Sequence, residues 1–199
     1  MRRMKTRGVP ADRLSIVIRV DHFAATRYDS LRRIGTVGRF VREKNYSLFL
    51  RAVARIADAD LVFVGDGPLR DELERQAGAR VRFLGKRANV AKLLAGFDVF
   101  VLSSSTEGMS IALLEAMAAS CPIVVAAVGG NTELIQHEVT GLVVPPDDEW
   151  ALSAAIERLL TNRGLANRLG RAAHEVVNRC YSVQIMTQPY EELWRWLAA

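Results

Sequence analysis

The sequence predicts an α/β fold: a Rossmann-like, doubly wound and mainly parallel sheet that ends in a C-terminal helical tail. Short apolar runs rich in Val, Ile, Leu and Phe, most of which stop at Gly, Ser or Pro, alternate with segments of helical periodicity. Beyond residue 145 the apolar runs stop and only helical patterns follow. Such alternation is typical of a parallel sheet covered by helices on both faces, and the helical remainder predicts the tail.

The apolar runs predict seven strands, over residues 14–20, 33–38, 60–65, 81–85, 98–104, 122–127 and 141–145. Helical patterns fill the intervals, over residues 44–57, 68–77, 89–96, 110–119 and 131–137. Three consecutive helices are expected after the last strand, over residues 147–162, 164–180 and 182–198. We therefore divide the chain into a linker-like segment (1–13), one Rossmann-like domain (14–180) and a C-terminal helix (181–199).

The composition is that of an ordinary soluble globular protein, with 50% hydrophobic and 25% charged residues among 199. No apolar run approaches the roughly 20 residues that span a bilayer, and no secretory signal follows the basic start, so we expect a cytoplasmic protein. The net charge of +5 favours anionic ligands. Nucleic acid is not an expected partner, because the arginines are scattered and no aromatic-basic strip accompanies them.

Ligands of doubly wound folds bind outside the carboxyl ends of the strands, at a topological switch point. Three segments lie just past a predicted strand end: Gly38-Arg39, Gly65-Asp66-Gly67 and the loop 103–108. The middle segment is half of a dinucleotide-binding fingerprint, but its third glycine is missing and Pro68 suits a first helical position, so a structural turn is favoured. A D-x-D pattern at 58–60 lies at the opposite edge, and we assign it no metal.

The third loop carries Glu107 and leads into a nearly apolar helix that carries Glu115, with seven residues between the two glutamates. Ser110 is a plausible N-cap, and the free N–H groups of the first turn make an anion site that Gly108 leaves open. A buried carboxylate needs donors. The donors to Glu115 are either the vicinal hydroxyls of a bound sugar or a donor within the protein, such as a loop N–H or an arginine. The sequence leaves both alternatives open.

Two cations follow the predicted strand 33–38. Arg39 comes directly after Gly38, and Lys44 follows five residues later, near the start of a helix. At the carboxyl edge of a sheet these side chains could clamp a diphosphate, the arginine as a bidentate fork and the lysine as a point charge. Taken alone, however, the pair is better explained as two solvated surface residues.

Together these segments resemble the C-terminal, donor-binding domain of the retaining glycosyltransferases of family four, which have the GT-B fold. The resemblance covers roughly residues 8–199. It is carried, in this order, by "VGRFVREKN", "VFVGDGPLRDEL", "VRFLGKR", "DVFVLSSSTEGMSIALLEAMAASCPIVVAAVGGNTELI" and "TGLVVPPDD". The E-x7-E element within the fourth segment is its most specific part.

The resemblance implies a role for each candidate residue. Arg39 and Lys44 match the basic pair that holds the donor diphosphate, and Glu107 matches the glutamate that faces the donor sugar; we group these three as catalytic. The implied substrate-binding residues are Gly38 beside the basic pair, Gly85 and Lys86 (with Arg87) beside the nucleobase, Gly108, Met109 and Ser110 at sugar and phosphate, and Glu115 at the ribose hydroxyls.

The implied activity is transfer of a hexose from a nucleoside-diphosphate sugar, with retention at the anomeric carbon and without a metal. No cofactor is expected beyond the donor itself, which would be UDP- or GDP-linked. The family enzyme has an N-terminal acceptor domain of similar size, so this chain is expected to act with such a domain in cis or in trans. A peripheral membrane association through that other half is a further option.

Two positions depart from the family pattern. Arg19-Val20 replaces the usual Asn-Gly, and Ser120 replaces a glycine after the E-x7-E helix. The last helix carries Trp194 and Trp196, which are either exposed for a partner or packed on their own domain. Two other functions stay open: a non-catalytic module that binds nucleotide or nucleotide sugar, and a general dinucleotide-binding domain suggested by the Gly65–Gly67 turn.

Overall fold

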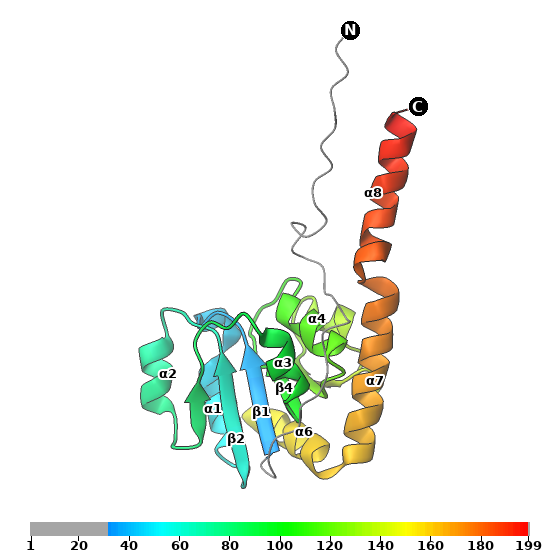
Figure 1. The fold of residues 1–199 in the computed structure, drawn as a ribbon. Coiled ribbons are helices and arrows are strands. Elements are labelled where there is room, and N and C mark those ends of the chain that lie inside the picture. Colours follow the sequence, from blue (N-terminus) through cyan, green and yellow to red (C-terminus); the bar gives the residue numbers. More distant parts are fainter. Residues whose placement is uncertain (1–31, 199) are drawn as a thin grey trace.

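The structure, a computed structural model, describes residues 32–198 (Figure 1). The linker-like segment 1–13, the strand expected over 14–20 and the departure at Arg19-Val20 lie outside the described residues. Six of the seven predicted strands are present and form one parallel sheet in the order β3-β2-β1-β4-β5-β6. They are β1 (Arg32–Val37), β2 (Ala59–Val64), β3 (Val81–Phe83), β4 (Val99–Leu102), β5 (Ile123–Ala126) and β6 (Leu142–Val144).

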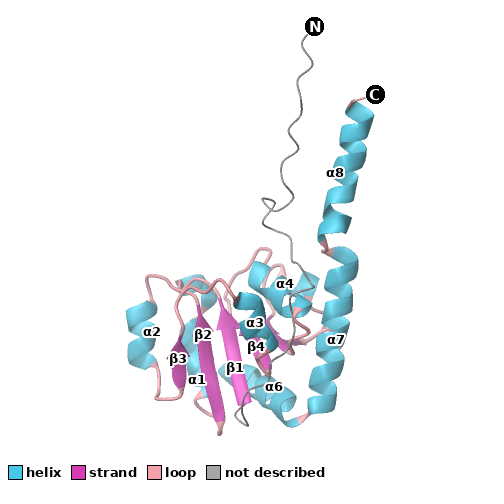
Figure 2. Cartoon of the chain, viewed as in Figure 1, coloured by secondary structure: helices cyan, strands magenta, loops and turns pink. Residues whose placement is uncertain are grey.

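Helices connect the strands, and the last three helices follow one another, as the sequence predicted (Figure 2). They are the short 3₁₀ helix η3 (Arg42–Lys44), α1 (Tyr46–Val53), α2 (Arg70–Gln76), α3 (Val90–Ala95), α4 (Ile111–Ala118), α5 (Asn131–Leu134), α6 (Glu149–Thr161), α7 (Arg163–Cys180) and α8 (Val183–Leu197). Several elements are shorter than predicted, among them α5, β3 and β4, and one difference has a clear local cause. The helix expected over 44–57 is divided, because Asn45 has a left-handed backbone (φ 47°) between η3 and α1.

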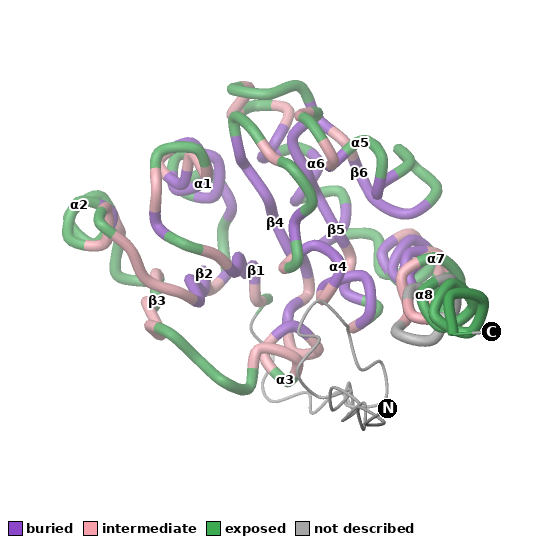
Figure 3. The backbone as a smooth tube through the Cα atoms, turned by 90° about the horizontal axis from the view of Figure 1, so that it is seen from above, coloured by how far each residue is buried: buried purple, intermediate pink, exposed green. Residues whose placement is uncertain are grey.

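The sheet separates two hydrophobic cores, one on each face (Figure 3). Alternate residues of β2 point to opposite faces, as a pleated strand requires: Leu61 and Phe63 pack with α1 and α6, whereas Val62 and Val64 pack with α3 and α4. Both faces are therefore buried. This explains why the strand sequences are continuous apolar runs rather than alternating ones.

The strand order reverses direction between β1 and β4, which are neighbours in the sheet. From β1 the chain moves outward through β2 and β3, and it then returns to β4 and continues through β5 and β6 on the other side. This arrangement makes the carboxyl ends of β1 and β4 the topological switch point, where ligands of such sheets bind.

Ser120 lies in a turn after α4 and has a positive φ of 55°. This is the position at which Ser120 replaces the glycine of the family pattern, and a non-glycine residue with this backbone is strained by roughly 1 kcal/mol. The turn packs against α7, where a Cβ on Gly170 would lie 2.3 Å from the Ser120 carbonyl oxygen. The strain is thus tolerated at a packed junction of two elements.

The last helix, α8, extends past the carboxyl edge of the sheet (Figure 1). Both of its tryptophans are exposed, Trp194 at 70% and Trp196 at 75% of their surface, so packing on their own domain is not what the structure shows. Tyr190, Leu193 and Leu197 are exposed with them. At helical spacing these side chains share one half of the helix, which is therefore an unpaired apolar face. Among the described helices, none is both long enough and apolar enough to cross a membrane.

Candidate functional site

Two loops meet at the switch point and are joined through their backbones. The hydroxyl of Ser103, just past β4, donates to the carbonyl oxygens of Lys44 (2.9 Å) and Asn45 (3.1 Å). The backbone N–H of Ser105 donates to the carbonyl oxygen of Glu43 at 2.8 Å. The segment after β1 and the segment after β4 thus form one unit, which fixes the starting points of the Lys44 and Glu107 side chains.

Lys44 and Glu107 form an ion pair between the Lys44 Nζ and the Glu107 Oε1 atoms. Ser104 donates a hydrogen bond from its hydroxyl to the same carboxylate oxygen at 3.1 Å. Both charged side chains are largely enclosed, with 19% of the Lys44 and 10% of the Glu107 side-chain surface exposed. For Lys44 the solvated-surface interpretation is therefore wrong, and two of the three residues that we group as catalytic are in direct contact.

A third loop supports Glu107 from behind. The backbone N–H of Gly130, after β5, donates to the Glu107 carbonyl oxygen at 3.1 Å. A Cβ on Gly129 would lie 1.8 Å from that oxygen, and one on Gly130 would lie 2.2 Å from the Gly108 carbonyl oxygen. Only glycine fits such close backbone contacts, and Gly129 also has a positive φ of 43°. The Glu107-Gly108 backbone is thus held from two sides.

The Gly65–Gly67 turn is required by packing, as the sequence favoured. A Cβ on Gly65 would lie 1.9 Å from the Gly38 carbonyl oxygen, and one on Gly67 would lie 2.5 Å from the carbonyl oxygen of Phe40. The turn also forms part of a wall of an open pocket of about 690 Å³ at the carboxyl edge. The pocket is lined by Val37, Gly38, Arg39, Val64, Gly65, Asp66, Gly67, Lys86, Arg87 and Val90.

This pocket unites several predicted residues but not all of them. Gly38, Arg39 and Lys86 line it, and Gly85 adjoins it, because the Gly85 carbonyl oxygen accepts a hydrogen bond from Gly65 N–H at 2.9 Å. Arg39 is exposed, and its guanidinium has no hydrogen-bond or ion-pair partner among the described residues. Neither Glu107 nor the start of α4 belongs to the pocket lining, so these lie beside it as a second cluster at the same edge.

The start of α4 has the geometry of an open anion site. Ser110 is the N-cap, as predicted, and its hydroxyl accepts the Leu113 N–H at 3.3 Å. A Cβ built on Gly108 meets nothing within 4 Å, so packing does not demand glycine there. Met109 is 60% exposed, and no described residue pairs with the backbone N–H groups of Gly108 and Met109. These donors remain available to a ligand.

Glu115 lies on α4 and is half-buried. No described arginine or loop N–H contacts its carboxylate, so the protein-internal partner that the sequence left open is not present in this part of the chain. Burial alone raises the pKa of the Glu115 carboxyl above its usual range. A half-buried carboxylate without donors fits a ligand that brings them, and vicinal hydroxyls are such donors.

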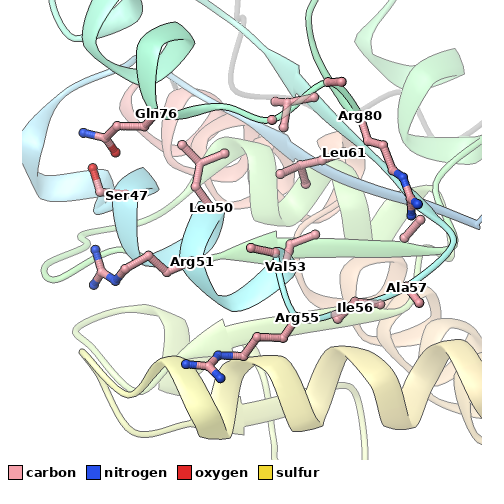
Figure 4. Close-up of a pocket in the computed structure, with 15 residues that line it drawn as sticks. Ser47, Leu50, Arg51, Val53, Arg55, Ile56, Ala57, Leu61, Gln76 and Arg80 are labelled. Carbon is pink, nitrogen blue, oxygen red and sulfur yellow. The ribbon is translucent and has the colours of Figure 1, made fainter.

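A larger pocket, of about 830 Å³, opens at the opposite, amino edge of the sheet between α1 and α2 (Figure 4). Its walls are apolar side chains such as Leu50 and Val53, with arginines at the rim. Arg51 and Arg55 are already used: each donates to one carboxylate oxygen of Glu149 at 2.8 Å, and the Arg55 guanidinium also lies over the Trp150 ring, outside the pocket lining. Arg51 and Arg55 are therefore satisfied within the protein, whereas the third arginine of the lining, Arg80, is exposed and only 4.0 Å from Asp58.

Sequence reasoning missed one part of the site and one residue packed beneath it. It gave no role to Gly129-Gly130, although a glycine pair shortly after the predicted strand 122–127 was a signal that this third loop reaches the same edge. It also missed Tyr46, whose hydroxyl lies 2.6 Å from the position that a Gly38 Cβ would take. Nothing in the sequence separates Tyr46 from an ordinary core aromatic residue. Within the described residues, no group of three His, Cys, Asp or Glu side chains could hold a metal ion.

Comparison with known proteins gives three findings of different weight. The chain matches the family model described as glycosyl transferases group 1 over residues 32–162. It is 32% identical over 163 residues to the lipopolysaccharide core biosynthesis glycosyltransferase LpsD of Rhizobium meliloti, a match that covers 79% of this chain and 48% of LpsD. The chain thus spans about half the length of the curated relatives that it matches.

Two solved structures place the fold. The crystal structure of HepE from Anabaena in complex with UDP-glucose superposes with a TM-score of 0.79 at 25% identity, over 83% of this chain and 49% of HepE. The C-terminal domain of LpcC, a glycosyl transferase group 1 family protein from Francisella tularensis, superposes with a TM-score of 0.73 over 84% of this chain and 100% of that domain. Its identity of 21% supports the fold alone.

Proposed function

Because the chain belongs to the group 1 glycosyl transferases and has their GT-B type of Rossmann-like domain, we propose that it binds the nucleoside-diphosphate sugar that serves as glycosyl donor. One observation carries the proposal. At the switch point a guanidinium, a half-buried carboxylate and backbone N–H groups, on Arg39, Glu115 and the Gly108-Met109 loop, have no partner among residues 32–198. Diphosphate and sugar hydroxyls are the complementary groups.

The proposed donor lies along this edge in a fixed order. Gly85 and Lys86 adjoin the nucleobase and Glu115 accepts the ribose hydroxyls. Arg39 and Lys44 bind the diphosphate together with the start of α4, and Glu107 faces the transferred hexose. The complexes of HepE with UDP and with UDP-glucose support a uridine-linked donor.

The proposed reaction is hexose transfer with retention at the anomeric carbon and without a metal or further cofactor. Catalysis then consists of positioning the sugar and stabilising negative charge on the leaving diphosphate, through Arg39, Lys44 and the N–H groups at the start of α4. Proton NMR of the first-formed product should show the anomeric configuration of the donor. Transfer that persists in excess EDTA is expected, and loss of transfer on chelation would contradict the metal-free mechanism.

Titration calorimetry of the chain with UDP, GDP, ADP and NAD tests donor binding. We expect one nucleoside diphosphate to bind with a dissociation constant of roughly 10–100 μM and NAD not to bind. Glu115→Ala and Arg39→Ala should weaken that binding, whereas Arg51→Ala, at the amino edge, should not. Unchanged affinity in both carboxyl-edge variants would contradict the proposal, and preferential binding of NAD would favour a dinucleotide-binding domain.

We further propose that transfer requires an acceptor domain, in cis or in trans, that covers the apolar face of α8. This face extends past the same edge of the sheet as the candidate site (Figure 1), so a partner seated on it would also close over the donor. Rapid transfer to a simple acceptor by this chain alone would contradict the requirement. Binding without transfer, even with the partner domain present, would instead indicate a non-catalytic module.

A further inference from the structure

The ion pair between Lys44 and Glu107 raises a question about how the donor enters. The proposed function gives Lys44 to the diphosphate and Glu107 to the sugar, yet without a ligand each side chain is the other's partner. Ser104 adds a hydrogen bond to the same Glu107 oxygen, so the free carboxylate is satisfied. A ligand that takes Lys44 must therefore leave Glu107 without its cation.

The backbone allows little relief of this conflict. Lys44 is held through its carbonyl oxygen by Ser103, and Glu107 is held through its carbonyl oxygen by Gly130 N–H. Because Gly129 and Gly130 already touch the Glu107-Gly108 backbone, that loop has no room to withdraw. Exchange of partners is therefore confined to the two side chains.

We propose that this ion pair makes the site discriminate between the intact nucleotide sugar and the nucleoside diphosphate product; the proposal rests on the function given above. A nucleotide sugar replaces both halves of the pair, since its phosphate binds Lys44 and its sugar hydroxyls donate to Glu107. A nucleoside diphosphate replaces only one half. When a nucleoside diphosphate binds, the enclosed Glu107 carboxylate loses its cation and lies close to the phosphates of the ligand. This is unfavourable because the ion pair is lost and because the like charges repel each other.

The same exchange assists turnover. Once the sugar has been transferred, Glu107 loses the hydroxyl donors and competes with the diphosphate for Lys44. Re-formation of the ion pair weakens the hold on the product, which keeps the nucleoside diphosphate from remaining bound. Glu107 thus acts on product affinity even though it faces the sugar and not the nucleotide.

The test compares two ligands in two matched variants. Dissociation constants of UDP and UDP-glucose are measured by titration calorimetry for the unmodified chain, for Glu107→Gln and for Glu43→Gln; GDP and GDP-mannose replace them if the chain binds guanosine diphosphate. Glu43 is an exposed carboxylate in the same loop as Lys44, so its variant has the same change in net charge without touching the ion pair. A double-mutant cycle of thermal unfolding, with Lys44→Gln, Glu107→Gln and the double variant, measures the coupling between the two side chains in the absence of ligand.

We expect Glu107→Gln to bind UDP about tenfold more tightly and UDP-glucose no more tightly, so the preference for the intact donor falls by that factor. Glu43→Gln should change both affinities alike, and the melting-temperature shifts in the cycle should be non-additive. If UDP binds the unmodified chain but Glu107→Gln leaves its affinity unchanged or weaker, the proposal is overturned while the proposed function stands. If neither ligand pair binds the unmodified chain, the proposed function fails and this inference with it.

Discussion

The two edges of the sheet carry pockets of opposite character. The amino-edge pocket is the larger, about 830 Å³ against about 690 Å³, and arginines line both. At the amino edge Arg51 and Arg55 are neutralised by Glu149. At the carboxyl edge Arg39 has no partner among the described residues, and neither has the carboxylate of Glu115.

This difference teaches that unsatisfied groups identify a ligand site better than volume does. Folding removes polar groups from water only where partners exist, so a half-buried group without a partner needs a reason. Paired arginines over apolar walls need none, because the ion pairs and the packing of their stems explain them. If this is right, the nucleotide binds at the carboxyl edge of the sheet and not at the amino edge.

The largest expected effect is on transfer. Arg39→Ala should lower kcat/KM, measured with the acceptor domain present, because the variant loses about 2–4 kcal/mol of transition-state stabilisation. This magnitude is taken by analogy from the loss of an oxyanion donor. Arg51→Ala is the matched control at the other edge, and its kcat/KM should stay within a factor of about three. Equal losses in the two variants would show that the contrast between the edges has no functional meaning.

The glycines of the carboxyl edge should separate stability from binding. Gly129→Ala places a Cβ 1.8 Å from a carbonyl oxygen at a positive φ, and we expect urea unfolding to show a loss of about 2–3 kcal/mol. Gly108→Ala meets no neighbour within 4 Å, so its stability should change by less than about 0.5 kcal/mol while nucleotide affinity falls. A large loss of stability in Gly108→Ala would mean that this glycine serves the fold.

Glu115 should make the unliganded domain less stable as the pH rises. Burial raises its pKa in the folded state, so the folded domain binds the proton more tightly than the unfolded chain does. The contribution of Glu115 to stability is therefore largest below the usual pKa of glutamate and is lost as the pH rises from there through the raised folded pKa. Glu115→Gln removes this loss, and thermal unfolding should show a gain at pH 7 that disappears at acidic pH.

The opposite finding for Glu115→Gln, a destabilisation at pH 7, would reveal a partner for the carboxylate within the protein. It would also remove the main reason to place ribose hydroxyls there. Glu133→Gln, which removes an exposed carboxylate on α5, serves as the control for the change in net charge.

The smallest effect is expected at Tyr46, whose hydroxyl is enclosed and has no geometrically satisfactory hydrogen bond, although the Thr36 hydroxyl is a close neighbour. Removal of a buried hydroxyl that lacks a good partner is nearly neutral, so Tyr46→Phe should change the free energy of unfolding by less than about 1 kcal/mol. Nucleotide affinity should not change, because the Tyr46 hydroxyl is buried beneath the Gly38 backbone and does not face the pocket. A clear loss of affinity would instead add this hydroxyl to the binding site.

The strands and helices, although not the order of the strands in the sheet, followed from sequence because they depend on patterns of several residues. Continuous apolar runs and helical periodicity predicted every strand within the described residues, and the cap at Ser110 followed from local chemistry. The positive φ of Ser120 could be anticipated only through the resemblance. Asn45 was not anticipated, since a single left-handed residue that divides a helical pattern leaves no periodic signal.

The site was predictable by residue but not by contact. Arg39, Glu107 and Glu115 could be placed at one edge because parallel strands end together. The ion pair of Lys44 with Glu107 could not, since it depends on hydrogen bonds between backbones that are about 60 residues apart in the chain, as in the bond from Ser105 to Glu43. Such contacts follow from three-dimensional packing, which one sequence does not encode as a local pattern.

The clamped backbone of the three loops also decides where conformational entropy is lost. Ser103, Ser105 and Gly130 order the segments around Lys44 and Glu107 when the domain folds, before any ligand arrives. A donor that binds there has to immobilise side chains only, at about 0.5–1.5 kcal/mol each, and not a loop. Its binding should accordingly show a heat-capacity change no larger than the buried ligand surface accounts for, with no additional signature of coupled folding.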